Sequence, residues 1–152
     1  MKLAEALILR ADYQKRIEQL KQRLLRNVKV QEGDDPAENP AVLVEEVERL
    51  AQELELLIQR INRTNAATPL QGELTISDAI ARRDILRLKH AIYRNLAQSA
   101  TVTHDRFSRS EVKFKSTVNV AEVQRTADEL AQEHRRLDAR IQEANWQTEL
   151  RE

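Results

Sequence analysis

The stretch Val42–Asn62, VLVEEVERLAQELELLIQRIN, decides the fold of this chain. Its large apolar side chains recur at alternating steps of four and three residues: Leu43, Val47, Leu50, Leu54, Leu57 and Ile61. This spacing places them on one face of a helix and is typical of a seam packed against another helix. Asn39 suits the cap position before such a helix and Pro40 suits its first turn. We therefore expect a helix over about residues 40–65.

Three further stretches have helical periodicity, and they predict helices over about residues 2–29, 78–102 and 120–150. The expected inner face of the first comprises Leu9, Tyr13, Ile17, Leu20, Leu24 and Val28. That of the third comprises Ala81, Ile85, Leu88, Ile92 and Leu96, and that of the fourth Val123, Ala127, Leu130, His134, Leu137, Ile141 and Ala144. We expect Ser77 to cap the third helix, after a short extended piece over residues 73–76, and Asn119 to cap the fourth.

The connections between these helices are short, which favours antiparallel neighbours. The fold class is therefore mostly all-α, a long antiparallel four-helix bundle that forms one domain over residues 1–152. Opposite local charges support the first hairpin. Residues 2–29 hold eight basic and three acidic side chains, whereas residues 32–55 hold nine acidic side chains and one basic side chain.

A strand is predicted over about residues 111–118, between the third and fourth helices, because apolar and polar side chains alternate there. Val112, Phe114 and Val118 lie on its apolar side. A lone strand leaves its backbone groups unpaired, and no partner strand is evident in the chain. We therefore expect these three residues to mediate self-association, so that the protein forms a homo-oligomer.

Composition excludes several classes of function. The chain has no cysteine, which rules out disulfide scaffolds, cysteine metal sites and cysteine nucleophiles. The 25 basic and 25 acidic residues balance, and aromatic residues make up 3%, so we expect no nucleic-acid partner. Residues 1–5 lack the pattern of a signal peptide, and no apolar run approaches the roughly 18 residues of a membrane span. These features predict a bacterial cytoplasmic protein with no membrane partner.

One polar cluster suggests a binding site for a small anion. Arginine side chains bind phosphate and carboxylate groups through their planar forks, and amides can orient such a ligand. The candidate residues for phosphate or carboxylate binding are Asn62, Arg63, Asn65, Arg82 and Arg83. A structural interpretation stays open, because basic side chains near Arg60–Asn65 suit a helix C-terminus. Likewise, the basic row Arg83, Arg87, His90 and Arg94 fits a solvated helix face or salt bridges to the acidic second helix.

No catalytic residues, metal ligands or cofactor are predicted. Residues 104–110 combine a histidine, an acid and two serines, but no Gly-x-Ser-x-Gly turn accompanies them, and a polar connection explains them. His134 and Asp138 could supply two metal ligands one turn apart, yet a buried, hydrogen-bonded histidine is the simpler interpretation.

Several segments carry a resemblance that spans almost the whole chain: residues 7–12 and 14–17, Arg60–Asn65, residues 106–114 and Ile141–Trp146. On these, the chain resembles an uncharacterised bacterial family whose members are often labelled septicolysin. That label implies a secreted, membrane-damaging toxin. Val112–Val118, however, is shorter than the roughly 9–11 residues of a membrane-spanning strand.

The sequence thus supports a non-enzymatic, self-associating helical scaffold or interaction protein of the cytoplasm. The alternatives are a binding protein for a small anion and, less favoured, a septicolysin-like membrane-damaging protein.

Overall fold

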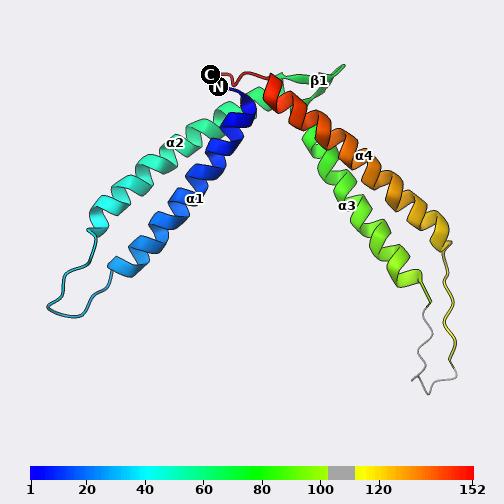
Figure 1. Ribbon diagram of the computed structural model, residues 1–152, viewed down its shortest axis with the longest axis horizontal. Coiled ribbons are helices and arrows are strands. Elements are labelled where there is room, and N and C mark those ends of the chain that lie inside the picture. The colour runs from blue at the N-terminus through cyan, green and yellow to red at the C-terminus, as the bar shows by residue number, and fades with distance from the viewer. Residues whose placement is uncertain (103–111) are drawn as a thin grey trace. The chain divides into compact units, whose positions relative to one another are not determined.

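The computed structural model describes residues 1–102 and 112–152. The chain divides into two compact units, which do not coincide with these two ranges. The elements, in chain order, are α1 (Leu3–Asn27), α2 (Pro40–Ala67), β1 (Pro69–Gln71), β2 (Leu74–Thr75), α3 (Ile76–Ala100) and α4 (Val120–Gln147) (Figure 1). Unit 1 comprises residues 1–69 and 142–152, and unit 2 comprises residues 70–141. The predicted fold class, mostly helical with four long helices, is confirmed.

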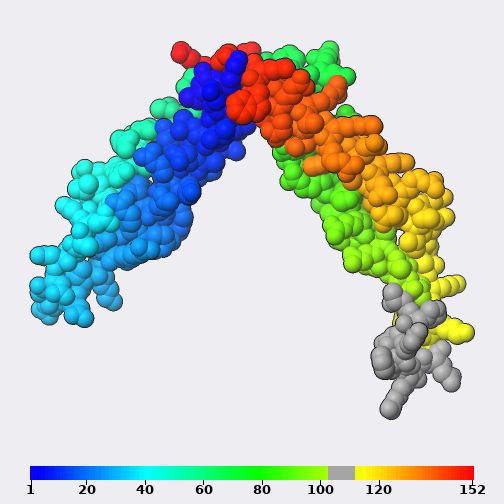
Figure 2. All heavy atoms as spheres, viewed as in Figure 1, coloured from blue at the N-terminus to red at the C-terminus, as the bar shows by residue number. Residues whose placement is uncertain are grey.

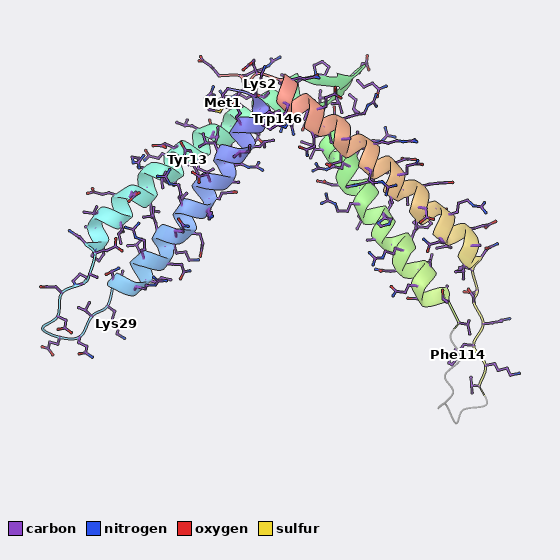
Figure 3. The ribbon with its side chains drawn as sticks, viewed as in Figure 1. Met1, Lys2, Tyr13, Lys29, Phe114 and Trp146 are labelled. Carbon is purple, nitrogen blue, oxygen red and sulfur yellow. The ribbon has the colours of Figure 1, made fainter. Side chains whose placement is uncertain are left out.

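Unit 1 is built on the antiparallel pair α1 and α2, whose side chains fill the space between the two helices (Figure 2). Its core is formed by Leu20, Leu43 and Leu50, against which Tyr13, Ile17, Leu24 and Val47 pack. The seam predicted for α2 is confirmed, because Leu43, Leu50, Leu57 and Ile61 are all buried. Tyr13 lies on the face of α1 that meets Glu53, and burial together with that carboxylate raises the pKa of its phenol (Figure 3).

The connection from α1 to α2 is fixed by side chains at both ends. Asn27 is buried, donates to the carbonyl of Arg23 and accepts from the amide of Glu38 at 3.0 Å. Arg23 forms an ion pair with the Glu38 carboxylate, which is one meeting point of the basic and acidic segments. The Asn39 side chain accepts from the amide of Ala41 at 3.0 Å, with Pro40 in the first turn, so the predicted cap of α2 is confirmed.

A small β-hairpin lies between α2 and α3, formed by β1 and β2. Gly72 occupies its turn with a φ of 57°, a left-handed conformation that glycine adopts without steric cost. Thr75 ends the hairpin and caps α3 through a reciprocal pair of hydrogen bonds with Asp78. The prediction of Ser77 as the cap is therefore wrong by two residues, because the Thr75–Asp78 pair satisfies the first amides of the helix one half-turn earlier.

The strand predicted over residues 111–118 is not present in its described part, residues 112–118. Among the described residues, the paired strands are β1 and β2, which lie between α2 and α3. A strand needs a neighbouring strand for its backbone groups, and alternating apolar residues do not supply one. At Ser116 the hydroxyl donates to the carbonyl of Val118 and accepts from its amide, which bends the segment before α4.

Unit 2 is built on α3 and α4, which run antiparallel. The start of α3 meets the end of α4 where Arg83 Nη1 donates to Asp138 Oδ1 at 2.9 Å. At the other end, Ala97 lines the same hollow as Val120 and Ala121. Asn119 accepts from the amide of Glu122 at 3.2 Å, which confirms the predicted cap of α4.

The face that α3 turns toward α4 differs from the predicted one. Ile76, Ala79, Leu86 and Ala97 are buried, and Arg83, His90 and Tyr93 are half-buried. The residues predicted to face inward are all exposed: Ala81, Ile85, Leu88, Ile92 and Leu96. On the side that faces α4, Arg83 pairs with Asp138, whereas Arg87 and Arg94 of the same basic row are exposed.

We expect the Asp138→Asn substitution to destabilise unit 2. It would leave the Arg83 guanidinium, whose side chain is 19% exposed, without its carboxylate across the helix pair. Because Asp138 is itself partly exposed, the expected loss in the free energy of unfolding is about 1 kcal/mol. Urea unfolding followed by circular dichroism would measure it. Asp128→Asn is the matched control, since Asp128 is exposed and accepts a hydrogen bond from Gln124 in the preceding turn of the same helix.

Candidate functional site

The feature of unit 2 that stands out is an apolar row on the solvent side of α3. We call it the α3 stripe: Ile85, Leu88, Ile92 and Leu96. Their side chains are 55%, 56%, 55% and 40% exposed. Steps of three, four and four residues place them on one helix face over three turns. Single exposed apolar residues are common on protein surfaces, but a continuous row of four marks a surface suited to contact with another molecule.

Charged residues border the α3 stripe on both sides. At 100° per residue, Arg82 and Lys89 fall along one edge, and Asp84 falls along the other. All three residues are exposed. One edge of the stripe therefore carries two cations and the other a single carboxylate, Asp84, which also pairs with Arg83 of the same helix.

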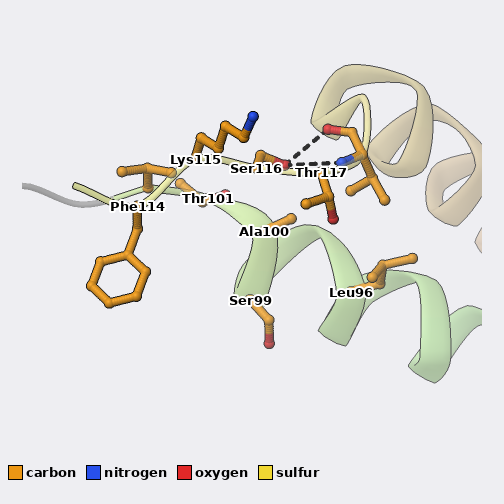
Figure 4. A pocket seen from close by; sticks show the side chains of 10 residues that line it. Leu96, Ser99, Ala100, Thr101, Phe114, Lys115, Ser116 and Thr117 are labelled. Atoms are coloured by element: carbon orange, nitrogen blue, oxygen red, sulfur yellow. Dashed lines mark hydrogen bonds between the residues drawn. The ribbon is translucent and has the colours of Figure 1, made fainter. Parts of the chain in front are cut away.

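A groove of about 450 Å³ continues the apolar surface past the last turn of α3 (Figure 4). Leu96 from the stripe lines it together with Phe114–Val118 from the segment before α4. Phe114 is 80% exposed and projects from that segment (Figure 3). Val112 and Val118 are also exposed. The three residues predicted to mediate self-association thus lie in an irregular segment that adjoins the α3 stripe.

The five residues predicted to bind an anion fall in different units. Asn62, Arg63 and Asn65 belong to α2 in unit 1, whereas Arg82 and Arg83 belong to α3 in unit 2. Arg83 is engaged by Asp138 and by Asp84 at 3.3 Å, so its guanidinium already has acidic partners. The joint role of the five residues stays a prediction.

In unit 1, the polar Arg60–Asn65 segment receives the C-terminal residues of the chain. Thr64 is fully buried, and its hydroxyl accepts from the amide of Arg151 at 3.0 Å. Arg60 Nε donates to the Arg151 carbonyl at 3.1 Å. These contacts give the segment a structural role that the sequence did not reveal. The Oδ1 atom of Asn65 is buried, and no described residue donates a hydrogen bond to it.

The two chain ends also pair with each other, and we call this set of contacts the terminal clasp. Lys2 and Glu149 face each other in an antiparallel bridge (Figure 3 labels Met1 and Lys2). The Leu3 amide donates to the Thr148 carbonyl, and the Leu150 amide donates to the Met1 carbonyl, both at 2.9 Å. The Glu149 carboxylate accepts from Lys2 and from the N-terminal ammonium group, and these cations lower its pKa.

A basic pocket of about 310 Å³ lies within unit 2, between the hairpin, α3 and α4. Three arginines line it, Arg82 from α3 and Arg136 and Arg140 from α4, together with one acid, Glu133. Arg140 donates to the side chain of Gln71 in β1. Of these residues, only Arg82 was predicted from the sequence to bind a ligand. Arg136 and Arg140 lie one helical turn apart, and this spacing is the sequence signal that could have identified them as a pair.

Two other features that the sequence suggested are the possible metal ligands His134 and Asp138 and the polar residues 104–110. Within residues 1–102 and 112–152 no group of three possible metal ligands comes together, and Asp138 is occupied by Arg83. His134 is half-buried, and its Nε2 atom has no hydrogen-bond partner among the described residues. Of residues 104–110, the described part of the chain includes none.

Comparisons with known proteins place the chain in a family. A model described as "Family of unknown function (DUF6847)" matches residues 10–150. The chain belongs to this family. It is also similar to a solved structure, the crystal structure of a functionally unknown conserved protein from Corynebacterium diphtheriae, with a TM-score of 0.94 and 46% identity over 99% of each chain. A search of proteins with curated descriptions gave no match.

These findings confirm that the chain resembles an uncharacterised family, but they do not support the septicolysin label, which neither description contains. Among the described helices, none combines the length and apolar character needed to cross a bilayer. The cytoplasmic location expected from the sequence stays a prediction.

We expect the terminal clasp to weaken in acid. Because the folded state lowers the pKa of Glu149, its contribution to stability is present above the ordinary value of 4.5 and is lost as the pH falls through the lower folded value. A Glu149→Gln variant should therefore be less stable than the parent at pH 7, and the difference should shrink below pH 4.5. Thermal unfolding across this range tests it. Glu152→Gln, at an exposed neighbouring carboxylate, should show no such difference.

Proposed function

We propose that this chain is a helical interaction protein that self-associates as a symmetric dimer, with the α3 stripe of one copy packed against that of a second copy. The observation that supports this proposal is the stripe itself: four large apolar side chains in register on a helix whose opposite face contacts α4. A helix with apolar residues on its solvent side is unusual for an isolated domain, because a surface helix normally carries charged and polar residues there.

Burial of the stripe would give a substantial driving force. Full burial of a leucine or isoleucine side chain contributes about 1.5–3 kcal/mol. Since the stripe residues are already close to half covered, each would contribute roughly half of that amount. Two copies place eight such side chains in the interface. The sum would exceed the orientational and translational cost of association at the lower end of its range, about 4 kcal/mol.

The charged edges favour a second copy, in parallel orientation, as the occupant. In a parallel helix pair the two different edges of the seam face each other, so Asp84 of one copy would lie opposite Lys89 of the other. In an antiparallel pair like edges would meet, and Lys89 would approach Arg82 of the other copy. Two-fold symmetry gives the Asp84–Lys89 pair twice, so the parallel dimer is self-complementary in charge as well as in shape.

The residues expected from the sequence to mediate self-association would extend this interface. Phe114 and Val118 line the groove that begins at Leu96, and Val112 lies on the same segment. A second copy seated on the α3 stripe would cover this groove and the exposed ring of Phe114. In this proposal they act as apolar contacts from an irregular segment, with no shared strand.

Charge placed within the stripe should dissociate the dimer. We expect the parent protein to sediment as a dimer at micromolar concentration, and Leu88→Glu to sediment as a monomer, because three turns of apolar contact would then enclose two like charges. Leu56→Glu is the matched control: Leu56 is exposed to a similar degree, 61%, on α2 of unit 1. Sedimentation velocity measures the oligomeric state of the parent protein and of both variants. A monomeric parent, or a control that dissociates equally, would contradict the proposal.

The orientation of the two copies is tested by exchanging the charges. We expect Asp84→Lys and Lys89→Glu each to raise the dissociation constant about threefold to tenfold, since opposite charges are replaced by like ones. The double variant should recover the parent value, because it restores the pair with its signs reversed. If Lys89→Glu alone tightens the dimer, the pairing is antiparallel and the parallel model is wrong. Circular dichroism of each variant monitors its helix content.

A further inference from the structure

We infer that the basic pocket of unit 2 is a binding site for a phosphate monoester with a small apolar group. This site is distinct from the four apolar residues of the α3 stripe, although Arg82, on the basic edge of the stripe, belongs to it. Arg82, Arg136 and Arg140 line it from two helices, and Gln71 in β1 accepts a hydrogen bond from Arg140. The three arginines are exposed and line one hollow that is contained within a single compact unit.

The pocket holds more positive than negative charge. Three arginines and one glutamate line it, which gives a formal balance of +2 (three minus one). In the described part of the chain, no carboxylate lies within ion-pair distance of Arg82, Arg136 or Arg140, whereas Arg83, one residue from Arg82, has two. Like charges held together are unfavourable unless an anion joins them.

The arginine set matches a phosphate better than a carboxylate. A phosphate monoester carries between −1.5 and −2 charges near neutral pH and offers three acceptor oxygens. It can therefore engage three guanidinium groups and offset the whole surplus of the pocket. A carboxylate carries one charge and two acceptor oxygens, so it would leave one arginine unpaired.

Apolar side chains define the rest of the ligand. Leu70, Leu74, Leu86 and Leu137 line the same pocket as the arginines. Leu86 is buried, and Leu70, Leu74 and Leu137 are half-buried, so they offer a wall that an inorganic ion would not contact. The volume of about 310 Å³ is at the small end of the range for sites that bind organic molecules. A phosphate attached to one ring or a short carbon chain fits both the charge and the size.

Isothermal titration calorimetry with phenyl phosphate tests the site on the full chain. We expect one phenyl phosphate per chain, with a dissociation constant at least about fivefold lower than that of inorganic phosphate, because the ring gains the leucine wall. Benzoate, which has the ring but a single charge, should bind more weakly than phenyl phosphate. Absence of heat with phenyl phosphate at millimolar concentration, or equal affinity for all three compounds, would overturn the inference.

Substitutions on α4 locate the site. Arg136→Gln should weaken phenyl phosphate binding about tenfold or more, since it removes a charge-assisted pair of hydrogen bonds. Arg135→Gln is the matched control, because Arg135 is its exposed neighbour and does not line the pocket. Equal loss in both variants would mean general charge attraction and would contradict the site. Arg82→Gln gives a second test from α3, and Leu88→Glu, with the stripe disrupted, should bind as the parent does.

Discussion

The ion pair between Arg83 and Asp138 is the constraint on which the surface of unit 2 depends. It crosses from the first turns of α3 to the last turns of α4, and the arginine side chain is largely enclosed. This pair lies on the side of α3 that faces α4, and it accompanies the rotation of α3 that the structure shows. Two consequences follow from that rotation. The apolar face of α3 points to solvent, and Arg82, 100° from Arg83 around the helix, enters the basic pocket.

The sequence contains enough information to predict α2 but not the rotation of α3. In α2 the row of large apolar side chains with the four-and-three spacing of a seam, Leu43 to Ile61, is the buried one. In α3 two rows have helical spacing. The first is the α3 stripe, and the second comprises Ala79, Arg83, Leu86, His90, Tyr93 and Ala97. Hydrophobicity favours the first, but the pairing of Arg83 with a residue 55 positions away favours the second. Periodicity identifies faces and does not identify their partners.

The candidate sites illustrate the same limit. Arg82 and Arg83 are adjacent in sequence, so a residue-by-residue interpretation assigns them one role, yet on a helix they serve different surfaces. Arg136 and Arg140 were missed because each has an ordinary structural explanation when considered alone. They gain meaning only when the hairpin and α3 bring Gln71 and Arg82 to the same pocket. The local signals for caps, by contrast, were reliable at Asn39 and Asn119, because a cap involves residues only two or three positions apart.

The contact between α3 and α4 includes small and polar side chains as well as apolar ones. In the inward row of α3, two of the six residues are alanines and three are Arg83, His90 and Tyr93. On α4, His134 and Asp138 are half-buried. The large apolar side chains that these two helices bury are Ile76, Leu86, Leu130 and Ile141. The apolar side chains of the α3 stripe lie on the opposite face and are exposed. In the proposed dimer, a second copy of the same stripe would remove them from water, which is the largest gain that association would offer this chain.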